Sequence, residues 1–356
     1  LEYGLNIILA MLASWKLGAA YIPIDPQWPV NRLQHVLENA EPNVVLTEQM
    51  QLEKLDLAEI VFDIPIVSFD RDAVEISASA NTSLAYQSTP TSLAYIIYTS
   101  GSTGTPKGVA LSHSALAVYL DSLFIKLQPT PKMEWLALST VSADLGYTSI
   151  FGALASGGTL RMMLGHFNLD AEALANSLQA RPVDILKIVP GHLSALLNIN
   201  DAKRLLPQKY LLCGGEALQP GLVEHVRQLA PKLPIINHYG PCEATIGAVM
   251  APAGEELKDG EIVVIGRPMP YRQIFILDKY LNPCGIGVTG ELHIGGEGLA
   301  DGYYNQPALT KEKFIAHPWL ADQRLYKTGD QACFIEDGNI QFFGRIDDQV
   351  KIRGHR

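Results

Sequence analysis

A loop of glycines and hydroxyl-bearing residues is the part of this sequence best suited to hold a charged ligand. It runs Tyr98-Thr99-Ser100-Gly101-Ser102-Thr103-Gly104-Thr105-Pro106-Lys107-Gly108 and directly follows the apolar residues 93–97. Small residues let a backbone approach a ligand closely, so backbone N–H groups, hydroxyls and one ammonium can wrap a polyphosphate. A flexible linker is the plain alternative, but a linker rarely follows an apolar run so directly. The loop therefore predicts a phosphate-binding site.

The P-loop of NTPases is a second way to bind phosphate, and this segment does not match it. The P-loop pattern is GxxxxGK[ST], in which the final hydroxyl holds Mg²⁺. Here Pro106 precedes Lys107 and Gly108 follows it, so that hydroxyl is missing. We therefore expect a phosphate site of another type.

The composition limits which kinds of protein this can be. The 356 residues are 47% hydrophobic and 18% charged, with a formal net charge of -10. These values predict a globular protein of two or three subdomains, and the negative charge argues against nonspecific binding to nucleic acid or anionic membranes. The four cysteines lack metal-binding spacing, which favours a reduced, cytoplasmic protein. The apolar run 5–15 is shorter than the about 20 residues that span a bilayer.

The elements that must position the loop are visible as alternating helical and strand-like segments. Helices are expected over 5–17, 31–39 and 114–124, and strands over 18–25 (with a proline-marked turn), 43–47, 94–98, 185–189, 210–213 and 235–238. Such alternation predicts parallel α/β sheets, and the short β-rich runs beyond residue 251 indicate a small β subdomain. We expect α/β subdomains over 1–250, a β-rich subdomain over 251–345 and a hinge over 346–356.

The loop and several further motifs together resemble the adenylate-forming superfamily, which includes acyl-CoA synthetases, luciferases and nonribosomal peptide synthetase adenylation domains. The matching segments cover essentially the whole chain in the right order: KLGAAYIPID (16–25), the loop (98–108), NHYGPCEAT (237–245), GELHIGG (290–296), YKTGD (326–330) and GRIDDQVKIRG (344–354). The first and last are most similar to the peptide-synthetase branch. The resemblance implies an α/β fold with two parallel-sheet α/β subdomains and a small β-barrel-like subdomain.

The resemblance also implies a nucleotide site. ATP would contact the loop residues Thr99, Ser100, Gly101, Ser102, Thr103, Gly104 and Lys107, and also Gly215, Glu216, Ala217, Asn237, Tyr239, Asp330 and Arg345. Glu243 would hold Mg²⁺, which prefers hard oxygen ligands, and the catalytic set would be Lys107, Thr103, Glu243 and Lys351. Alone, Asp330 could be a turn residue and Glu243 a helix N-terminal charge, but the ordered set speaks against both. Cys242 is a departure, because the family usually has threonine there and a thiol is a weaker donor.

A gap-free match over 142–151 places Asp144 where the family holds the ammonium of an amino-acid substrate. A carboxylate is the natural partner of that cation, and a helix N-cap is the structural alternative. The other specificity positions become Leu145, Thr148, Lys187, Leu212, Gly214, His238, Ile246 and Gly247.

Lys187 and His238 suggest which amino acid fits. With a period of two, Lys187 faces the side of Ile185 and Val189. An unpaired ammonium buried there would cost several kcal/mol, so it should meet an anion unless it snorkels to water. His238 alone would more often be a satisfied core residue, but with Lys187 it would form a cationic end of the pocket. Gly214 and Gly247 would leave room for the substrate.

A pocket with Asp144 at one end and these cations at the other fits aspartate, with asparagine and glutamate as alternatives. The implied reaction is ATP-dependent formation of aminoacyl-AMP, followed by loading of a carrier-protein phosphopantetheine beside condensation domains. Catalysis would rest on positioning and charge stabilisation. The family's C-terminal subdomain with its lysine would follow the hinge at Asp347, so this chain is expected to be weakly active or inactive. An acyl- or aryl-CoA ligase core and a nonenzymatic ligand-binding module remain alternatives.

Overall fold

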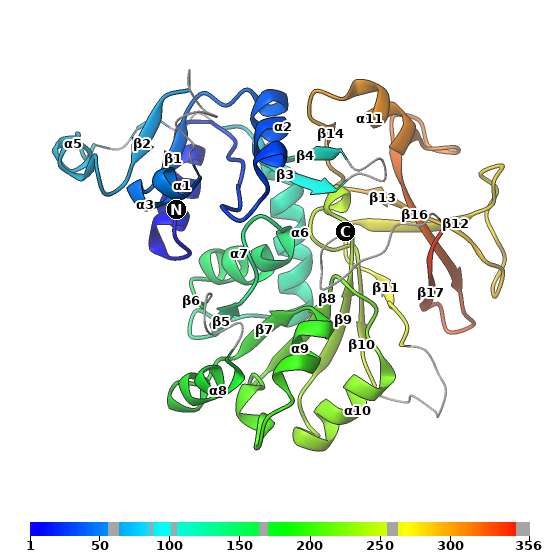
Figure 1. The fold of residues 1–356 in the computed structure, drawn as a ribbon. Coiled ribbons are helices and arrows are strands. Elements are labelled where there is room, and N and C mark those ends of the chain that lie inside the picture. Colours follow the sequence, from blue (N-terminus) through cyan, green and yellow to red (C-terminus); the bar gives the residue numbers. More distant parts are fainter. Residues whose placement is uncertain are drawn as a thin grey trace.

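The structure is a computed structural model that describes residues 1–55, 64–82, 84–85, 88–100, 105–163, 170–254 and 263–346. It is built from four sheets with helices packed around them (Figure 1). The expected α/β fold with a small, curled β subdomain is confirmed. Within the described residues, no helix combines the length and the hydropathy that crossing a bilayer requires.

The N-terminal part is a small α/β layer around a two-stranded parallel sheet. Its elements are α1 (Leu5–Lys16), α2 (Val30–Ala40), β1 (Val45–Thr47), α3 (Gln49–Leu55), β2 (Ile66–Ser68) and α5 (Ala73–Ala78). The strand expected over 18–25 is wrong, because only Tyr21 pairs, in an isolated parallel bridge to Tyr95. Pro23 and Pro26 have no N–H to donate to a ladder, which explains why pairing does not extend.

The glycine loop connects two antiparallel strands, β3 (Leu93–Ser100) and β4 (Pro106–Ser112), and α6 (His113–Leu127) begins only after the second. The helix expected over 114–124 is confirmed as part of α6, but the strand β4, which was not predicted, comes before it. The reason is that Val109, Ala110 and Leu111 are buried and pair with β3 before the chain turns. A third strand, β14 (Gly302–Tyr303), joins β4 from far along the chain.

The central sheet has seven strands in the order β11-β10-β9-β8-β7-β5-β6. These are β5 (Glu134–Ala137), β6 (Thr159–Met162), β7 (Ile185–Ile188), β8 (Tyr210–Gly214), β9 (Ile235–Tyr239), β10 (Val249–Pro252) and β11 (Arg267–Pro268). Strands β5 to β9 are parallel, whereas β10 and β11 run antiparallel. The sequence predicts a subdomain boundary between residues 250 and 251. Because β11 lies beyond it, the central sheet contains strands from both predicted subdomains, and the boundaries stay a prediction.

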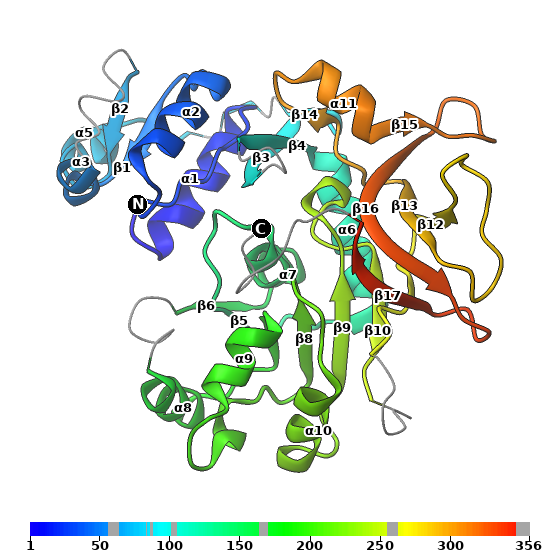
Figure 2. The ribbon, with the colours of Figure 1, turned by 45° about the vertical axis from the view of Figure 1, so that its right-hand side comes forward.

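Helices cover both faces of this sheet (Figure 2). Residues of α6 and α7 (Tyr147–Ser156) pack with Trp135, Ile185 and Leu212 on one face. The opposite face packs against α8 (Ala171–Ala180), α9 (Pro190–Leu196) and α10 (Pro220–Leu229). Because side chains of a strand alternate between faces, Lys187 shares the α6–α7 face with Ile185, as its spacing predicts.

The C-terminal part is a curled antiparallel sheet beside the central one (Figure 2). It contains β12 (Arg272–Leu277), β13 (Gly290–Gly296), β15 (Phe314–Ala316), β16 (Arg324–Phe334) and β17 (Ile340–Arg345), with α11 (Pro307–Lys313) packed beside β14 and β15. Short 3-10 turns η1 (Asp144–Gly146), η3 (Ala202–Leu205) and η4 (Cys242–Ala244) complete the described structure.

A close contact between α7 and β5 gives a test of this packing. A Cβ at Gly152 would lie 2.6 Å from Cζ3 of Trp135, which is fully buried. We expect Gly152→Ala to lower the free energy of unfolding by about 1–3 kcal/mol through overpacking, measured by urea unfolding followed by circular dichroism. The matched control is Gly221→Ala in α10, where no described atom lies within 4 Å of the new Cβ and alanine is the better helix former. Equal effects of the two changes would contradict the contact.

Candidate active site

A cavity of about 130 Å³ opens at the carboxyl ends of strands β3, β7 and β9. Crevices at the carboxyl ends of parallel strands are where α/β proteins bind ligands. Five of the predicted substrate-binding residues line it: Asp144, Leu145, Lys187, His238 and Ile246. The nucleotide-binding candidates Thr99 and Gly215 line the same cavity. The structure thus brings members of both predicted sets to one cavity.

The other four predicted substrate-binding residues lie behind this wall. Thr148 and Leu212 are fully buried, and the Thr148 hydroxyl is 2.8 Å from the Tyr119 hydroxyl. A Cβ at Gly214 would lie 2.5 Å from Lys187 Nζ, and one at Gly247 would overlap the His238 ring. The space beside both glycines is therefore filled by Lys187 and His238, rather than left for a substrate as expected.

Asp144 is the first residue of η1, the turn that leads into α7. The N-caps of these two elements are Ala143 and Gly146, so Asp144 itself caps neither and the structural alternative does not apply. Its side chain is largely buried, and its negative charge adds to the effect of burial in raising the pKa of Tyr95, Tyr119 and Tyr147. Asp144 therefore puts a carboxylate in the cavity wall.

Lys187 and His238 are almost fully buried, and Lys187 Nζ is in hydrogen-bond contact with His238 Nδ1. Burial lowers the pKa of Lys187 to about 7, although Cys213 and Asp144 act in the opposite direction. Burial and the neighbouring Lys187 together lower the pKa of His238. Lys187 does not snorkel to water. With both pKa values lowered, the pair holds at most one positive charge near neutral pH, because two cations in contact would repel strongly in a buried site.

A second polar cluster forms around Lys107 near the start of β4. Lys107 Nζ is 2.9 Å from Glu243 Oε1 and 2.7 Å from the Tyr303 hydroxyl, which itself donates to Glu243 Oε1 at 2.7 Å. Glu243 is fully buried, and burial and Glu243 raise the pKa of Tyr303. Sequence reasoning missed Tyr303, because it lies on β14, where it pairs with Val109 of β4, 194 positions away in the chain.

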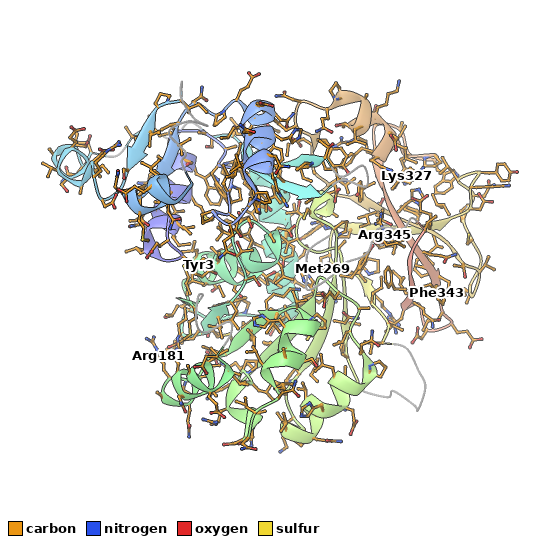
Figure 3. The ribbon with its side chains drawn as sticks, viewed as in Figure 1. Tyr3, Arg181, Met269, Lys327, Phe343 and Arg345 are labelled. Atoms are coloured by element: carbon orange, nitrogen blue, oxygen red, sulfur yellow. The ribbon has the colours of Figure 1, made fainter. Side chains whose placement is uncertain are left out.

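Three of the predicted ATP contacts, Tyr239, Asp330 and Arg345, form a third cluster. Tyr239 at the end of β9 donates its hydroxyl hydrogen bond to Asp330 Oδ2. Asp330 and Arg345 are cross-strand partners in β16 and β17, with Arg345 Nη1 3.0 Å from Asp330 Oδ1. In Figure 3, Arg345 lies at the inner end of β17 and Phe343 farther out. Burial and Asp330 together raise the pKa of Tyr239.

The remaining predicted ATP contacts follow β8 or lie on β9. Gly215 has a φ of 89°, which favours glycine, and the next residue, Glu216, accepts a hydrogen bond from the Gly191 N–H at 3.1 Å. Ala217 is exposed. Asn237 donates from Nδ2 to the Val264 carbonyl at 2.9 Å. Gly101, Ser102, Thr103, Gly104 and Lys351 lie outside the described residues, and Ser100 is described only as the end of β3.

The donor set fits ATP with Mg²⁺. The buried Thr99 hydroxyl has no hydrogen-bond partner among the described residues and lines the cavity, which suits a phosphate oxygen. No group of three His, Cys, Asp or Glu able to hold a metal ion occurs in the described ranges. Magnesium at phosphate sites usually needs only one or two protein carboxylates, because phosphates and waters complete its shell. Glu243 can supply that carboxylate, with Lys107 close enough to neutralise phosphate charge.

Two more residues at the cavity were missed by sequence reasoning. Trp28 and Arg32 line it, with the Arg32 guanidinium 4.0 Å from the Trp28 ring centroid and Arg32 Nη2 donating to the Tyr98 carbonyl at 3.3 Å. Trp28 precedes α2 and Arg32 lies in its first turn, so no single periodic pattern links them. Arg32 adds one cation beside Tyr98.

Comparisons with known proteins identify the family. The sequence pattern of the family described as AMP-binding enzyme matches residues 1–304. Gramicidin S synthase 1 of Brevibacillus brevis is 36% identical over 359 residues, covering 100% of this chain and 31% of the relative. Tyrocidine synthase 1 of Brevibacillus parabrevis is 35% identical, covering 100% and 32%. The chain spans about a third or less of the length of these relatives.

Solved structures show the same fold. The nonribosomal peptide synthetase FmoA3 superposes with a TM-score of 0.88 at 27% identity, covering 97% of this chain and 36% of that one. A four-domain nonribosomal peptide synthetase bound to AMP and glycine gives a TM-score of 0.79 at 32% identity, covering 98% and 25%. The chain therefore belongs to the AMP-binding enzyme family, as an adenylation domain of the nonribosomal peptide synthetase type.

Proposed function

We propose that this protein activates L-aspartate with ATP, forming aspartyl-AMP and pyrophosphate. The observation that carries the proposal is the single cavity lined by Asp144, Lys187 and His238 beside Thr99 and Gly215. A carboxylate and an ammonium in one wall match the α-ammonium and the side-chain carboxylate of aspartate. Family membership supports the nucleotide half of the reaction.

In this reaction the substrate supplies the nucleophile. An oxygen of its α-carboxylate attacks the α-phosphorus of ATP, a P–O bond forms, and the bond to the pyrophosphate oxygen breaks. Lys107 lies close to the loop and is held by Glu243 and Tyr303, so it can neutralise charge that develops on the phosphates. Bound at Glu243, Mg²⁺ would add Lewis-acid stabilisation of phosphate oxygens. Asp330 and Arg345 would orient the ribose.

The proposed partners follow from the multidomain relatives. Aspartyl-AMP is a mixed anhydride, so its acyl group can pass to the phosphopantetheine thiol of a carrier domain with release of AMP. We propose that the protein works beside carrier and condensation domains in this way. The chain's similarity throughout its length to peptide synthetases supports this assignment.

The substrate proposal is tested by calorimetric titration of amino acids in the presence of a nonhydrolysable ATP analogue. One charge-assisted hydrogen bond is worth roughly 1.5–3 kcal/mol, so aspartate should bind about 10–100-fold more tightly than asparagine. Lys187→Met should remove this preference, because it weakens the binding of aspartate and leaves the binding of asparagine unchanged. The control is Lys209→Met, a half-exposed lysine paired with Asp184 at 3.4 Å. Tighter binding of asparagine, glutamate or a hydrophobic acid would identify a different substrate.

The pH dependence of binding gives a second test. In the ligand-free protein, Lys187 has a pKa of about 7. A bound carboxylate raises this pKa, so the lysine takes up a proton when aspartate binds. The protonated form binds, and we expect the Kd for aspartate to rise roughly tenfold per unit above pH 7. Asparagine, titrated from pH 6 to 9, should show no such rise. A flat aspartate profile would contradict the role of Lys187.

The nucleotide half is tested at Asp330. Asp330→Asn removes the charged acceptor of Tyr239 and Arg345 and should weaken ATP binding about tenfold or more, measured by fluorescent-ATP displacement. Asp322→Asn changes an exposed carboxylate and serves as the control. Unchanged ATP affinity in Asp330→Asn would remove this residue from the nucleotide site.

A further inference from the structure

His238 is closely packed and meets the cavity with very little exposed surface. Lys187 Nζ contacts its Nδ1, the Tyr119 ring lies 5.9 Å away between centroids, and its Nε2 edge is pressed against Gly247. The ring is 2% exposed. It therefore has one orientation, with Nδ1 turned to the lysine.

This contact allows only one proton between the two nitrogens. A lysine ammonium has donors and no acceptor, whereas a neutral imidazole has one donor and one acceptor nitrogen. For the ammonium to donate, Nδ1 must carry the lone pair and the ring proton must be on Nε2. An imidazolium would instead set N–H against N–H at hydrogen-bond distance.

We propose that His238 stays neutral with its proton on Nε2, and that it acts as a positioning residue whose Nδ1 orients the Lys187 ammonium toward the ligand. The inference rests on the proposed function for the ligand, but the state of the imidazole can be observed without any substrate. With a neutral His238, the pocket presents one oriented cation, the Lys187 ammonium, to the ligand.

Several groups face this pair from the elements packed against it. Asp144 from η1 and Cys213 from β8 raise the pKa of Lys187, and the Tyr119 ring from α6 lies beside the His238 ring. Arg272 from β12 lowers the pKa of Tyr119. Of these, only Asp144 brings negative charge that favours an ammonium at neutral pH.

Packing holds the arrangement in place. Tyr119 is fully buried and tied to Thr148, so the ring beside His238 is fixed. A Cβ at Gly214 would come within 2.5 Å of Lys187 Nζ, which limits the amine to the side facing His238 and the cavity. Both glycine positions thereby keep donor and acceptor in contact.

The first experiment reads the imidazole directly. Protein labelled with ¹⁵N-histidine contains nine histidines, and the His238 signals are those missing from His238→Asn. Two-bond proton–nitrogen correlation spectra from pH 6 to 8 should show one protonated and one lone-pair nitrogen throughout, with the proton on Nε2. An imidazolium pattern at pH 7, or a proton on Nδ1, would overturn the proposal.

The second experiment tests whether His238 is a hydrogen-bond acceptor or a second cation, from the direction in which His238 variants shift the pH midpoint of aspartate binding. In His238→Leu the acceptor is lost, so the pH midpoint of aspartate binding should fall by about 1–2 units. His238→Asn places an amide oxygen near the position of Nδ1 and should keep the midpoint within about half a unit of the original. If His238 were a second cation, both changes would raise the midpoint, since a like charge would be removed. An unchanged midpoint in His238→Leu would equally refute the positioning role.

Failure of the substrate proposal would look different. If wild-type protein binds no aspartate at any pH while the spectra show the neutral Nε2–H form, the assigned substrate is wrong and the state of His238 stands. If aspartate binds and the imidazole is charged, the substrate stands and this inference is wrong.

Discussion

A lysine amine buried inside a parallel sheet is the constraint around which the proposed substrate pocket is arranged. An ammonium removed from water is costly unless polar partners compensate, and Lys187 on β7 meets His238 on the neighbouring-but-one strand β9. Strand β8 lies between them and contributes Gly214, whose missing side chain lets the two groups meet. The positive end of the cavity therefore depends on a glycine in the intervening strand as much as on the two basic residues.

The same logic of neighbouring strands joins the nucleotide site to the rest of the molecule. Tyr303 comes from the short β14 that pairs with β4, and its hydroxyl holds both Lys107 and Glu243. Asp330 and Arg345 are paired across β16 and β17 of the curled sheet, while their partner Tyr239 belongs to the central sheet. The hydrogen bond from Tyr239 to Asp330 thus ties the central sheet to the curled sheet, and Tyr303 ties β14 to Lys107 of β4 and to Glu243 of η4.

The charge state of the pocket shows why residue types alone mislead. Two basic residues in a specificity set suggested two positive charges, and direct contact reduces them to one because the low dielectric interior magnifies repulsion. Similarly, two glycines suggested empty space, yet neighbouring side chains fill it. Both corrections concern which groups touch, and that information is absent from spacing along the chain.

The sequence by itself determined the α/β class and the family, since these depend on local periodicity and ordered motifs, and it pointed to seven of the residues that line the cavity. It also placed Lys187 on the correct face of its strand through the period of two. Only the tertiary structure decided that the glycine loop joins an antiparallel hairpin, that Tyr303 reaches Lys107 across 196 positions, and that Lys187 Nζ meets His238 Nδ1. Pairing between distant strands and burial of charged groups arise from the whole fold, so no local pattern encodes them.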